Sequence, residues 1–163
     1  MFPQVPIHHC ILPLCSRRPT FHSLKNPSRV QFSSKRADQE DGFSVDILMT
    51  SGENVKDAMR NTNITCPLAM AQNLLLWGHL CPTAPDTMPL HPGITDDVFM
   101  LKSLPHLFFI GNQSEFGSSE WKGTKIVSVP SFAKTSQVVI VDSEFQMMTL
   151  RFSVQKNCTT EAK

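Results

Sequence analysis

The strongest constraint on the fold is a short apolar run, Leu107 to Ile110, that lies between Pro105 and Gly111-Asn112. Four apolar residues with such boundaries predict a strand that is buried on both faces. Gly111 allows a sharp turn after the strand, and Asn112 and Gln113 place amide side chains at that turn. Ligands of α/β domains gather at the carboxyl ends of buried strands, so the candidate site is sought there.

A second strand is predicted from Phe43 to Met49, followed by a turn at Thr50-Ser51-Gly52 and a short helix from Asn54 to about Arg60. Asn54 is expected to cap the amino end of this helix. Hydroxyls at such turns are more often caps than nucleophiles, and no general base is recognisable near Ser51. A structural role is therefore favoured for Ser51.

A second helix is predicted from Thr65 to about Trp77, with Gly78 at its end. Its expected buried stripe consists of Leu68, Ala71, Leu75 and Trp77. Prolines then predict a stiff, extended loop that reaches about Ile94. This loop would hold His79 and Asp86 too far apart to form an acid–base pair.

Three short strands are predicted near the end of the chain, at Thr124–Val129, Gln137–Val141 and Met147–Phe152. Their spacing suits an antiparallel meander that closes one side of a sheet. The residues from Ser114 to Gly123 are expected to form a polar loop anchored by Trp121.

The charges are unevenly placed along the 163 residues. Residues 1–37 contain six Lys/Arg and no acid, whereas residues 38–163 contain nine Lys/Arg and fourteen Asp/Glu. The acidic bulk of the chain does not favour strong direct binding of nucleic acid. Prolines in the basic start break the amphipathic helix of a transit peptide, and no apolar run approaches the roughly 20 residues of a membrane span.

The first 37 residues contain five prolines and are expected to form extended, irregular chain. His8, His9 and Cys10 are potential metal ligands, but adjacent side chains on extended chain point to opposite faces, which disfavours chelation of one ion. The five cysteines form no C-x-x-C pair, so no zinc site or disulfide framework follows from their spacing.

Several motifs, in order along the chain, resemble those of the small (B) subunits of DNA polymerase delta. Pro3–Cys10 is similar to that family's Pro-Gln-Gln-Pro-Leu-His-x-Cys, and Asn26-Pro27 and Thr50–Val55 follow. The most specific motif is His79–Thr87, which contains Pro-Thr-Ala-Pro-Asp-Thr. Pro105–Gln113 and Lys122-Gly123 complete the resemblance, whose principal motif positions are Gly52, His79, Pro82, Thr83, Pro85, Asp86, Pro105, His106, Gly111 and Asn112.

The resemblance implies an α/β fold: part of a calcineurin-like phosphoesterase β-sandwich with flanking helices, ending in an antiparallel strand meander. Active relatives of that fold take late metal ligands from a His-Gly turn and a Gly-His-x-His turn. Aligned with these turns, Ser51, Asn112 and Ser114 stand at the three ligand positions. Neutral hydroxyls and amides replace imidazole poorly in a two-metal site, so the resemblance implies no catalysis, no metal and no cofactor.

Departures from the family pattern also matter. Residues 33–42 are longer than the family's short turn, Glu53 replaces Gln, and Leu104 stands where Cys is common. The family's oligonucleotide-binding-type barrel and the first half of its phosphoesterase-like domain have no counterpart here. The strands near Phe43 and Leu107 are therefore expected to lack partner strands, and the chain alone is expected to be poorly soluble.

The resulting hypothesis divides the chain into a lead-in (residues 1–42), the C-terminal part of a phosphoesterase-like B-subunit domain (43–155) and a flexible tail (156–163). It describes a fragment of a nuclear, non-catalytic accessory subunit that binds the catalytic subunit and other accessory subunits, and reaches DNA indirectly. One alternative is a metal-dependent phosphoesterase that uses His79, Asp86 and His91. The other is a truncated product without function.

Overall fold

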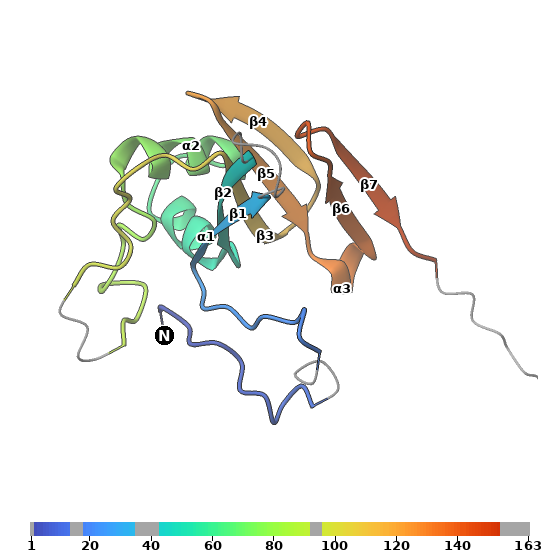
Figure 1. Ribbon diagram of the computed structural model, residues 1–163. Helices are drawn as coiled ribbons and strands as arrows, with labels where there is room; N and C mark the ends of the chain where they lie inside the picture. The colour runs from blue at the N-terminus through green and yellow to red at the C-terminus, as the bar shows by residue number, and fades with distance from the viewer. Residues whose placement is uncertain (1, 14–17, 35–42, 92–95, 154–163) are drawn as a thin grey trace, which may run out of the picture.

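The computed structural model describes residues 2–13, 18–34, 43–91 and 96–153, which form a mixed α/β structure (Figure 1). Five strands form one sheet in the order β1-β2-β3-β5-β4, and β6 and β7 form a separate two-stranded sheet. In Figure 1 the five-stranded sheet lies between α1 and α2 on one side and the β6–β7 pair on the other. The elements are β1 (Ser28–Ser34), β2 (Phe43–Thr50), α1 (Glu53–Arg60), α2 (Pro67–Trp77), β3 (Leu107–Gln113), β4 (Gly117–Trp121), β5 (Thr124–Pro130), α3 (Phe132–Thr135), β6 (Gln137–Val141) and β7 (Met147–Arg151).

The predicted buried strand is confirmed as β3, the central strand of the sheet. It pairs in parallel with β2 on one edge and with β5 on the other. Phe108 and Ile110 are both 0% exposed and belong to the core cluster that includes residues of α1 and α2. The prediction of burial on both faces is confirmed only in part, because Phe108 and Ile110 are fully buried under the helices whereas Phe109, on the other face, is half-buried.

The prediction of irregular chain before Phe43 is wrong for Ser28–Ser34, which forms β1 and pairs antiparallel with β2 along seven residues. The strands β2 and β3 therefore have partners on both edges within this chain. The expectation of unpaired strands near Phe43 and Leu107 is thus wrong, because β1 and β5 supply the partners. The loop or insertion expected at residues 33–42 begins inside β1, which includes Ser33 and Ser34, and its remaining residues 35–42 lie outside the described residues, as does the tail at 156–163.

The prediction that the last three strands form one antiparallel meander is also wrong. Its first strand, β5, lies inside the main sheet, parallel to β3, and only β6 and β7 pair antiparallel with each other. The polar loop expected before β5 contains β4, which pairs antiparallel with β5. Trp121 is half-buried and packs against the core, so it anchors this edge of the sheet as predicted.

The helix α1 begins one residue earlier than predicted, and Asn54 is not its cap. The capping position is Gly52, which has a left-handed backbone with φ 83°. Asn54 lies inside the helix, 1% exposed, and its amide donates a 2.7 Å hydrogen bond to the backbone carbonyl of Leu80. Its Oδ1 accepts a 2.6 Å bond from the Thr50 hydroxyl, so this side chain ties α1 to β2 and to the loop that follows α2.

The helix α2 ends at Gly78, as predicted, and Gly78 takes the left-handed conformation (φ 68°) that often ends a helix. Its buried residues are Met70, Ala71, Leu74 and Leu75. The prediction of Trp77 in the buried stripe is wrong, because its side chain is 48% exposed. Among the described residues, none of the helices has the length and apolar character that crossing a membrane requires.

Candidate functional site

The turn after β2, at Ser51-Gly52, lies against Gly111-Asn112 of β3. The sequence predicted that the strand ends before Gly111, but the structure includes Gly111–Gln113 in β3, and its pairing with β5 shifts register between Ile110 and Gln113. This irregular part of β3, Gly111-Asn112, is called the second turn below. Because the two strands are parallel and paired through Thr50 and Ile110, their carboxyl ends reach the same edge of the sheet. A Cβ atom on Gly52 would lie 2.1 Å from the carbonyl oxygen of Gly111. Only glycine fits this contact, and its positive φ independently favours glycine.

The first of these turns is held by Asn26, from the segment before β1. The Asn26 amide donates a 2.8 Å hydrogen bond to the Ser51 hydroxyl, and its Oδ1 accepts a 3.0 Å bond from the Ser51 backbone N–H. The same amide donates to Oε1 of Gln4 at 2.7 Å. The Asn-Pro motif at this position therefore fixes the orientation of Ser51 relative to the sheet.

The second turn is held to the first and to α1. Asn112 has a φ of 56°, and its amide donates to the Ser51 carbonyl at 3.3 Å. The Lys56 ammonium donates a 2.6 Å hydrogen bond to the Asn112 carbonyl. Ser51 and Asn112, two of the ligand positions that the resemblance implied, are thus in contact, whereas Lys56 and Asn26 were not predicted as members of this site.

Beside these turns lies an open cavity of about 1050 Å³. Ser51, Asn112 and Ser114 all line it, so the structure brings the three predicted ligand positions to one place. Charged side chains from the helices also line it, namely Lys56, Lys134, Arg60, Glu53 and Asp57. None of the described residues around the cavity is a histidine or a cysteine.

The proline-rich loop after α2 is fastened to α1 through Asp57, a residue that is 7% exposed. Oδ2 of Asp57 accepts hydrogen bonds from the Thr83 hydroxyl at 2.5 Å and from the Thr87 hydroxyl at 2.6 Å. The two threonines of the Pro-Thr-Ala-Pro-Asp-Thr motif therefore satisfy a buried charge. The other motif side chains Pro82, Pro85 and Asp86 are exposed on this loop.

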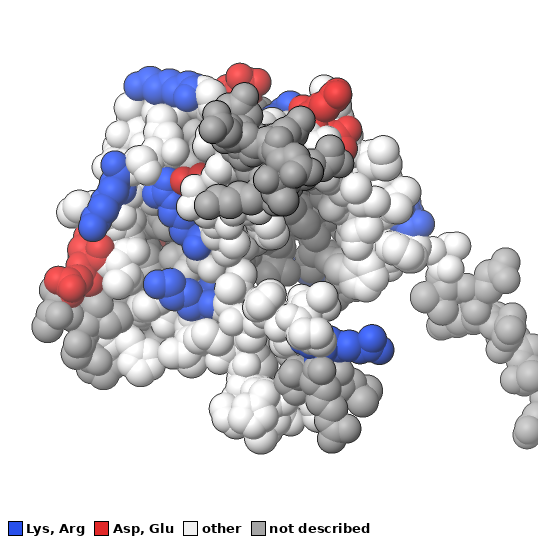
Figure 2. Space-filling model, viewed as in Figure 1, with Lys and Arg blue, Asp and Glu red and all other residues white. Residues whose placement is uncertain are grey.

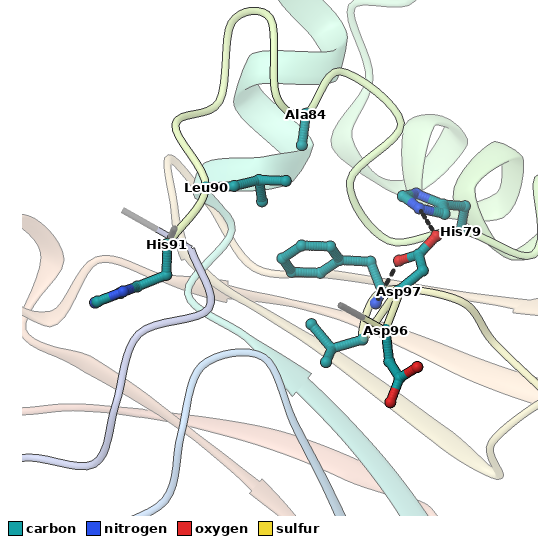
Figure 3. A pocket seen from close by; sticks show the side chains of 8 residues that line it. His79, Ala84, Leu90, His91, Asp96 and Asp97 are labelled. Carbon is teal, nitrogen blue, oxygen red and sulfur yellow. Dashed lines mark hydrogen bonds and ion pairs between the residues drawn. The ribbon is translucent and has the colours of Figure 1, made fainter. Parts of the chain in front are cut away.

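His79 pairs with Asp97 and not with Asp86, in a small pocket of about 260 Å³ (Figure 3). Its Nε2 lies 2.9 Å from Oδ2 of Asp97, and its Nδ1 accepts a 3.1 Å bond from the Cys81 N–H. Burial acts to raise the pKa of Asp97. The hydrogen bonds from the Phe99 N–H and from His79 outweigh this, so the pKa lies below its ordinary value.

The alternative metal set of His79, Asp86 and His91 does not come together. Figure 3 shows His91 across the pocket from His79, with its imidazole directed away. Asp86 does not line this pocket. The prediction that His79 and Asp86 form no acid–base pair is consistent with this arrangement, since His79 contacts Asp97 instead.

The Pro-His motif before β3 ties together the starts of three strands. The buried carbonyl of Pro105 accepts a 2.7 Å hydrogen bond from the Thr124 hydroxyl at the start of β5. His106 accepts a 3.0 Å bond at Nδ1 from the Asp46 N–H of β2, and its carbonyl accepts a 2.9 Å bond from the Lys125 N–H. This motif therefore fixes the register of the central strands, at the end of the sheet opposite the cavity.

The charged side chains show no single basic surface on the face drawn in Figure 2. There, several Lys and Arg side chains of the described residues lie in the left half of the view, with neutral and acidic side chains between them.

Residues 1–118 match the model of the family of B subunits of DNA polymerases alpha and epsilon. The chain is 39% identical over 147 residues to "DNA polymerase delta subunit 2" of Drosophila melanogaster, a match that covers 87% of this chain and 32% of the relative. It is 31% identical over 161 residues to "DNA polymerase delta small subunit" of Arabidopsis thaliana, covering 95% of this chain and 34% of the relative.

A third relative, "DNA polymerase delta small subunit" of Saccharomyces cerevisiae, is 30% identical over 127 residues, covering 61% of this chain and 26% of that protein. The chain thus spans about a third or less of the length of these relatives. The family match extends from the lead-in through β1, β2, both long helices and β3 into β4, and so includes both turns of the candidate site. The chain belongs to the family of B subunits of DNA polymerases alpha and epsilon, and its similar relatives are small subunits of DNA polymerase delta.

Proposed function

We propose that the chain acts as part of the accessory (B) subunit of DNA polymerase delta in DNA replication. The observation that carries this proposal is the similarity to three delta small subunits, two of which match along 87% and 95% of the chain. In this role the folded surface binds the catalytic subunit and joins it to other accessory subunits. The protein acts in the nucleus and reaches DNA through the complex.

The proposed fold is the C-terminal part of a calcineurin-like phosphoesterase domain, and its cavity is a metal site that has lost its ligands. Two-metal phosphoesterase sites depend on carboxylate, imidazole and amide donors. Here the positions at Ser51, Asn112 and Ser114 offer hydroxyls and one amide. Ser51 and Asn112 already contact protein partners.

The charge beside the cavity also opposes a metal pair. The Lys56 ammonium contacts the carbonyl of Asn112, so it holds a positive charge directly at the second turn. A cation there repels a divalent metal ion. The donor set therefore does not fit a two-metal centre, and the turns serve to join β2, β3 and α1.

The length of the chain relative to its relatives supports the proposal that it is a portion of a longer subunit. The alternative of a product that cannot fold has weaker support, since β2 and β3 both have two partner strands. A paired central sheet gives the chain a core on which a binding surface can be built.

The binding proposal is tested by co-expressing the chain with the C-terminal region of the delta catalytic subunit. Co-purification in a defined ratio is expected, and the corresponding region of another replicative polymerase serves as the specificity control. Equal capture of both regions, or of neither, would contradict the proposal.

The non-catalytic role is tested with a generic aryl phosphate and Mn²⁺. We expect no turnover above the metal-only rate. Manganese-stimulated hydrolysis that disappears in Asn112→Ala would identify the cavity as an active phosphoesterase site and overturn the proposal.

A further inference from the structure

His8, His9 and Cys10 form a compact group of nitrogen and sulfur donors in the segment before β1. One donor atom from each residue lies within 4.8 Å of the others. The two imidazole rings have centroids 4.0 Å apart, and all three side chains are exposed. This group lies outside the strand-end cavity, whose lining does not include it.

The backbone of this segment explains why the three side chains converge. The N–H of Ile11 donates to the carbonyl of His8 at 3.0 Å, and the N–H of Leu12 donates to the carbonyl of His9 at 3.2 Å. These bonds make two successive turns where the sequence predicted extended chain. The prediction that adjacent side chains point to opposite faces is therefore wrong at this place, because it holds only for extended backbone.

Gln4 before the turns and Asn26 after them hold the two ends of this segment together. Gln4 and Asn26 exchange two backbone hydrogen bonds of 2.8 and 2.9 Å, and the Ser23 hydroxyl donates to the Ile7 carbonyl at 3.1 Å. Because Asn26 also contacts Ser51, these ends are fixed to the five-stranded sheet. A ligand that binds at His8, His9 and Cys10 would therefore bind a segment that hydrogen bonds already hold in place.

We propose that His8, His9 and Cys10 bind a single Zn²⁺ ion, with water in the fourth position. Two imidazole nitrogens and one thiolate form a donor set that zinc prefers over Ca²⁺ or Mg²⁺, which take oxygen ligands. Zinc–nitrogen bonds of about 2.0–2.1 Å and zinc–sulfur bonds of about 2.3 Å place these tetrahedral ligands roughly 3.3–3.6 Å apart. Side-chain rotation on an exposed turn can close the remaining separation.

Binding exchanges protons in a defined way. The Cys10 thiol releases its proton to solvent and its sulfur forms the bond to zinc. In the metal-free chain the N–H of Cys10 donates a 3.3 Å bond to Nδ1 of His8. That bond is lost whichever nitrogen of His8 binds the metal. If Nδ1 binds, its lone pair is used by the metal, and if Nε2 binds, the ring proton lies on Nδ1, which can then no longer accept.

The probe is Co²⁺, added to the full 163-residue chain in a metal-free buffer with a phosphine reductant. We expect one equivalent to bind with a thiolate-to-cobalt absorption band, and Zn²⁺ to displace it. Cys10→Ser should abolish the band, and His9→Ala should weaken binding at least about tenfold. Cys66→Ser is the matched control, because Cys66 is the other exposed cysteine of the described chain, and it should leave the band unchanged.

A band that survives in Cys10→Ser, or that disappears equally in Cys66→Ser, would show adventitious binding and overturn the proposal. Far-ultraviolet circular dichroism of each metal-free variant checks that the fold is kept. If Cys10→Ser does not fold, cobalt binding is measured with the His8→Ala/His9→Ala double variant instead. A cobalt affinity equal to that of the wild type in this variant would also overturn the proposal.

Discussion

The Thr83 hydroxyl donates a 2.5 Å hydrogen bond to Oδ2 of Asp57, which joins the proline-rich loop to the helix α1. The Thr87 hydroxyl donates to the same oxygen at 2.6 Å. Asp57 is 7% exposed, so these two donors replace the water that a carboxylate would otherwise bind. The motif that most specifically marks the resemblance thus has a structural role: it compensates a buried charge.

Replacing Asp57 tests this role. Asp57→Ala leaves two partly buried hydroxyls without their acceptor, and we expect it to lower the free energy of unfolding by about 1–3 kcal/mol. Chemical denaturation measures the effect. Asp86→Ala, at an exposed carboxylate of the same loop, is the control and should change stability by less than about 0.5 kcal/mol. Equal effects in the two variants would show that the contacts with Asp57 do not hold the loop.

The contact between the two strand-end turns is tested by Gly52→Ala. Its left-handed backbone alone costs a non-glycine residue about 1–2 kcal/mol. The added methyl would also meet the Gly111 carbonyl at 2.1 Å, so the total loss of stability should exceed about 2 kcal/mol. Chemical denaturation of the variant and the wild type measures the difference.

Gly123→Ala is the matched control for this prediction. Gly123 has nearly the same φ, 79°, but an added Cβ would have nothing within 4 Å. The Gly123→Ala variant should therefore lose only the stability that a left-handed backbone costs a non-glycine residue. If both variants lose the same stability, Gly52 does not lie against the Gly111 carbonyl of β3.

The elements that the sequence predicted correctly are those whose local pattern matches their final environment. The apolar run of β3, the alternating run of β2 and the β-branched residues of β6 all give strong strand signals. Gly78 marks a helix end by its conformational freedom. The strands β1 and β4 are polar, with sequences SRVQFSS and GSSEW, and lie at the two edges of the sheet. Their strand structure depends on a partner strand, which the local sequence does not reveal.

The candidate site was predictable only in part, for a similar reason. The convergence of Ser51 and Asn112 follows from the parallel pairing of β2 and β3. The contributions of Asn26 and Lys56 come from segments whose placement depends on the tertiary fold. Asn54 was mistaken for a cap because an asparagine near a helix start is usually one. Its buried bonds to β2 and to the loop after α2 give no signal in the sequence.

The ion pair between Arg29 of β1 and Asp46 of β2 makes stability depend on pH. The Arg29 guanidinium donates hydrogen bonds to both carboxylate oxygens, and this lowers the pKa of Asp46 below its ordinary value despite partial burial. A depressed carboxyl pKa contributes stability above the unfolded-state pKa of about 4, and this contribution is lost as the pH falls through the folded pKa.

We therefore expect Asp46→Asn to be less stable than the wild type at pH 6–7, and the difference to shrink as the pH falls below about 4. The pair is partly exposed, so the difference should be modest and smaller at high salt. Urea denaturation at a series of pH values measures it. A stability difference that stays constant from about pH 7 to about pH 2.5 would rule out the ion pair as its source.

The thiol of Cys81 should be unreactive in the folded chain. Burial raises its pKa to about 11, and the nearby negative charge of Asp57 acts in the same direction. At pH 8 only about one thiol in a thousand is then a thiolate, the form that reacts with alkylating agents. Mass spectrometry after iodoacetamide treatment should find Cys10 and Cys66 modified early and Cys81 modified only after denaturation. Rapid labelling of Cys81 under native conditions would contradict its buried position.

The central position of β3 predicts how the chain responds to a cavity in its core. Because β3 pairs with both β2 and β5 and packs against one helical layer, we expect a single cooperative thermal transition for the 163-residue chain. Phe108→Ala removes a side chain that is 0% exposed and should lower the free energy of unfolding by about 3–5 kcal/mol. Phe32→Ala, at a side chain of β1 that is 59% exposed, should cost less than about 1 kcal/mol. A Phe108→Ala variant that melts at the wild-type temperature would mean that β3 is not the strand around which this sheet is built.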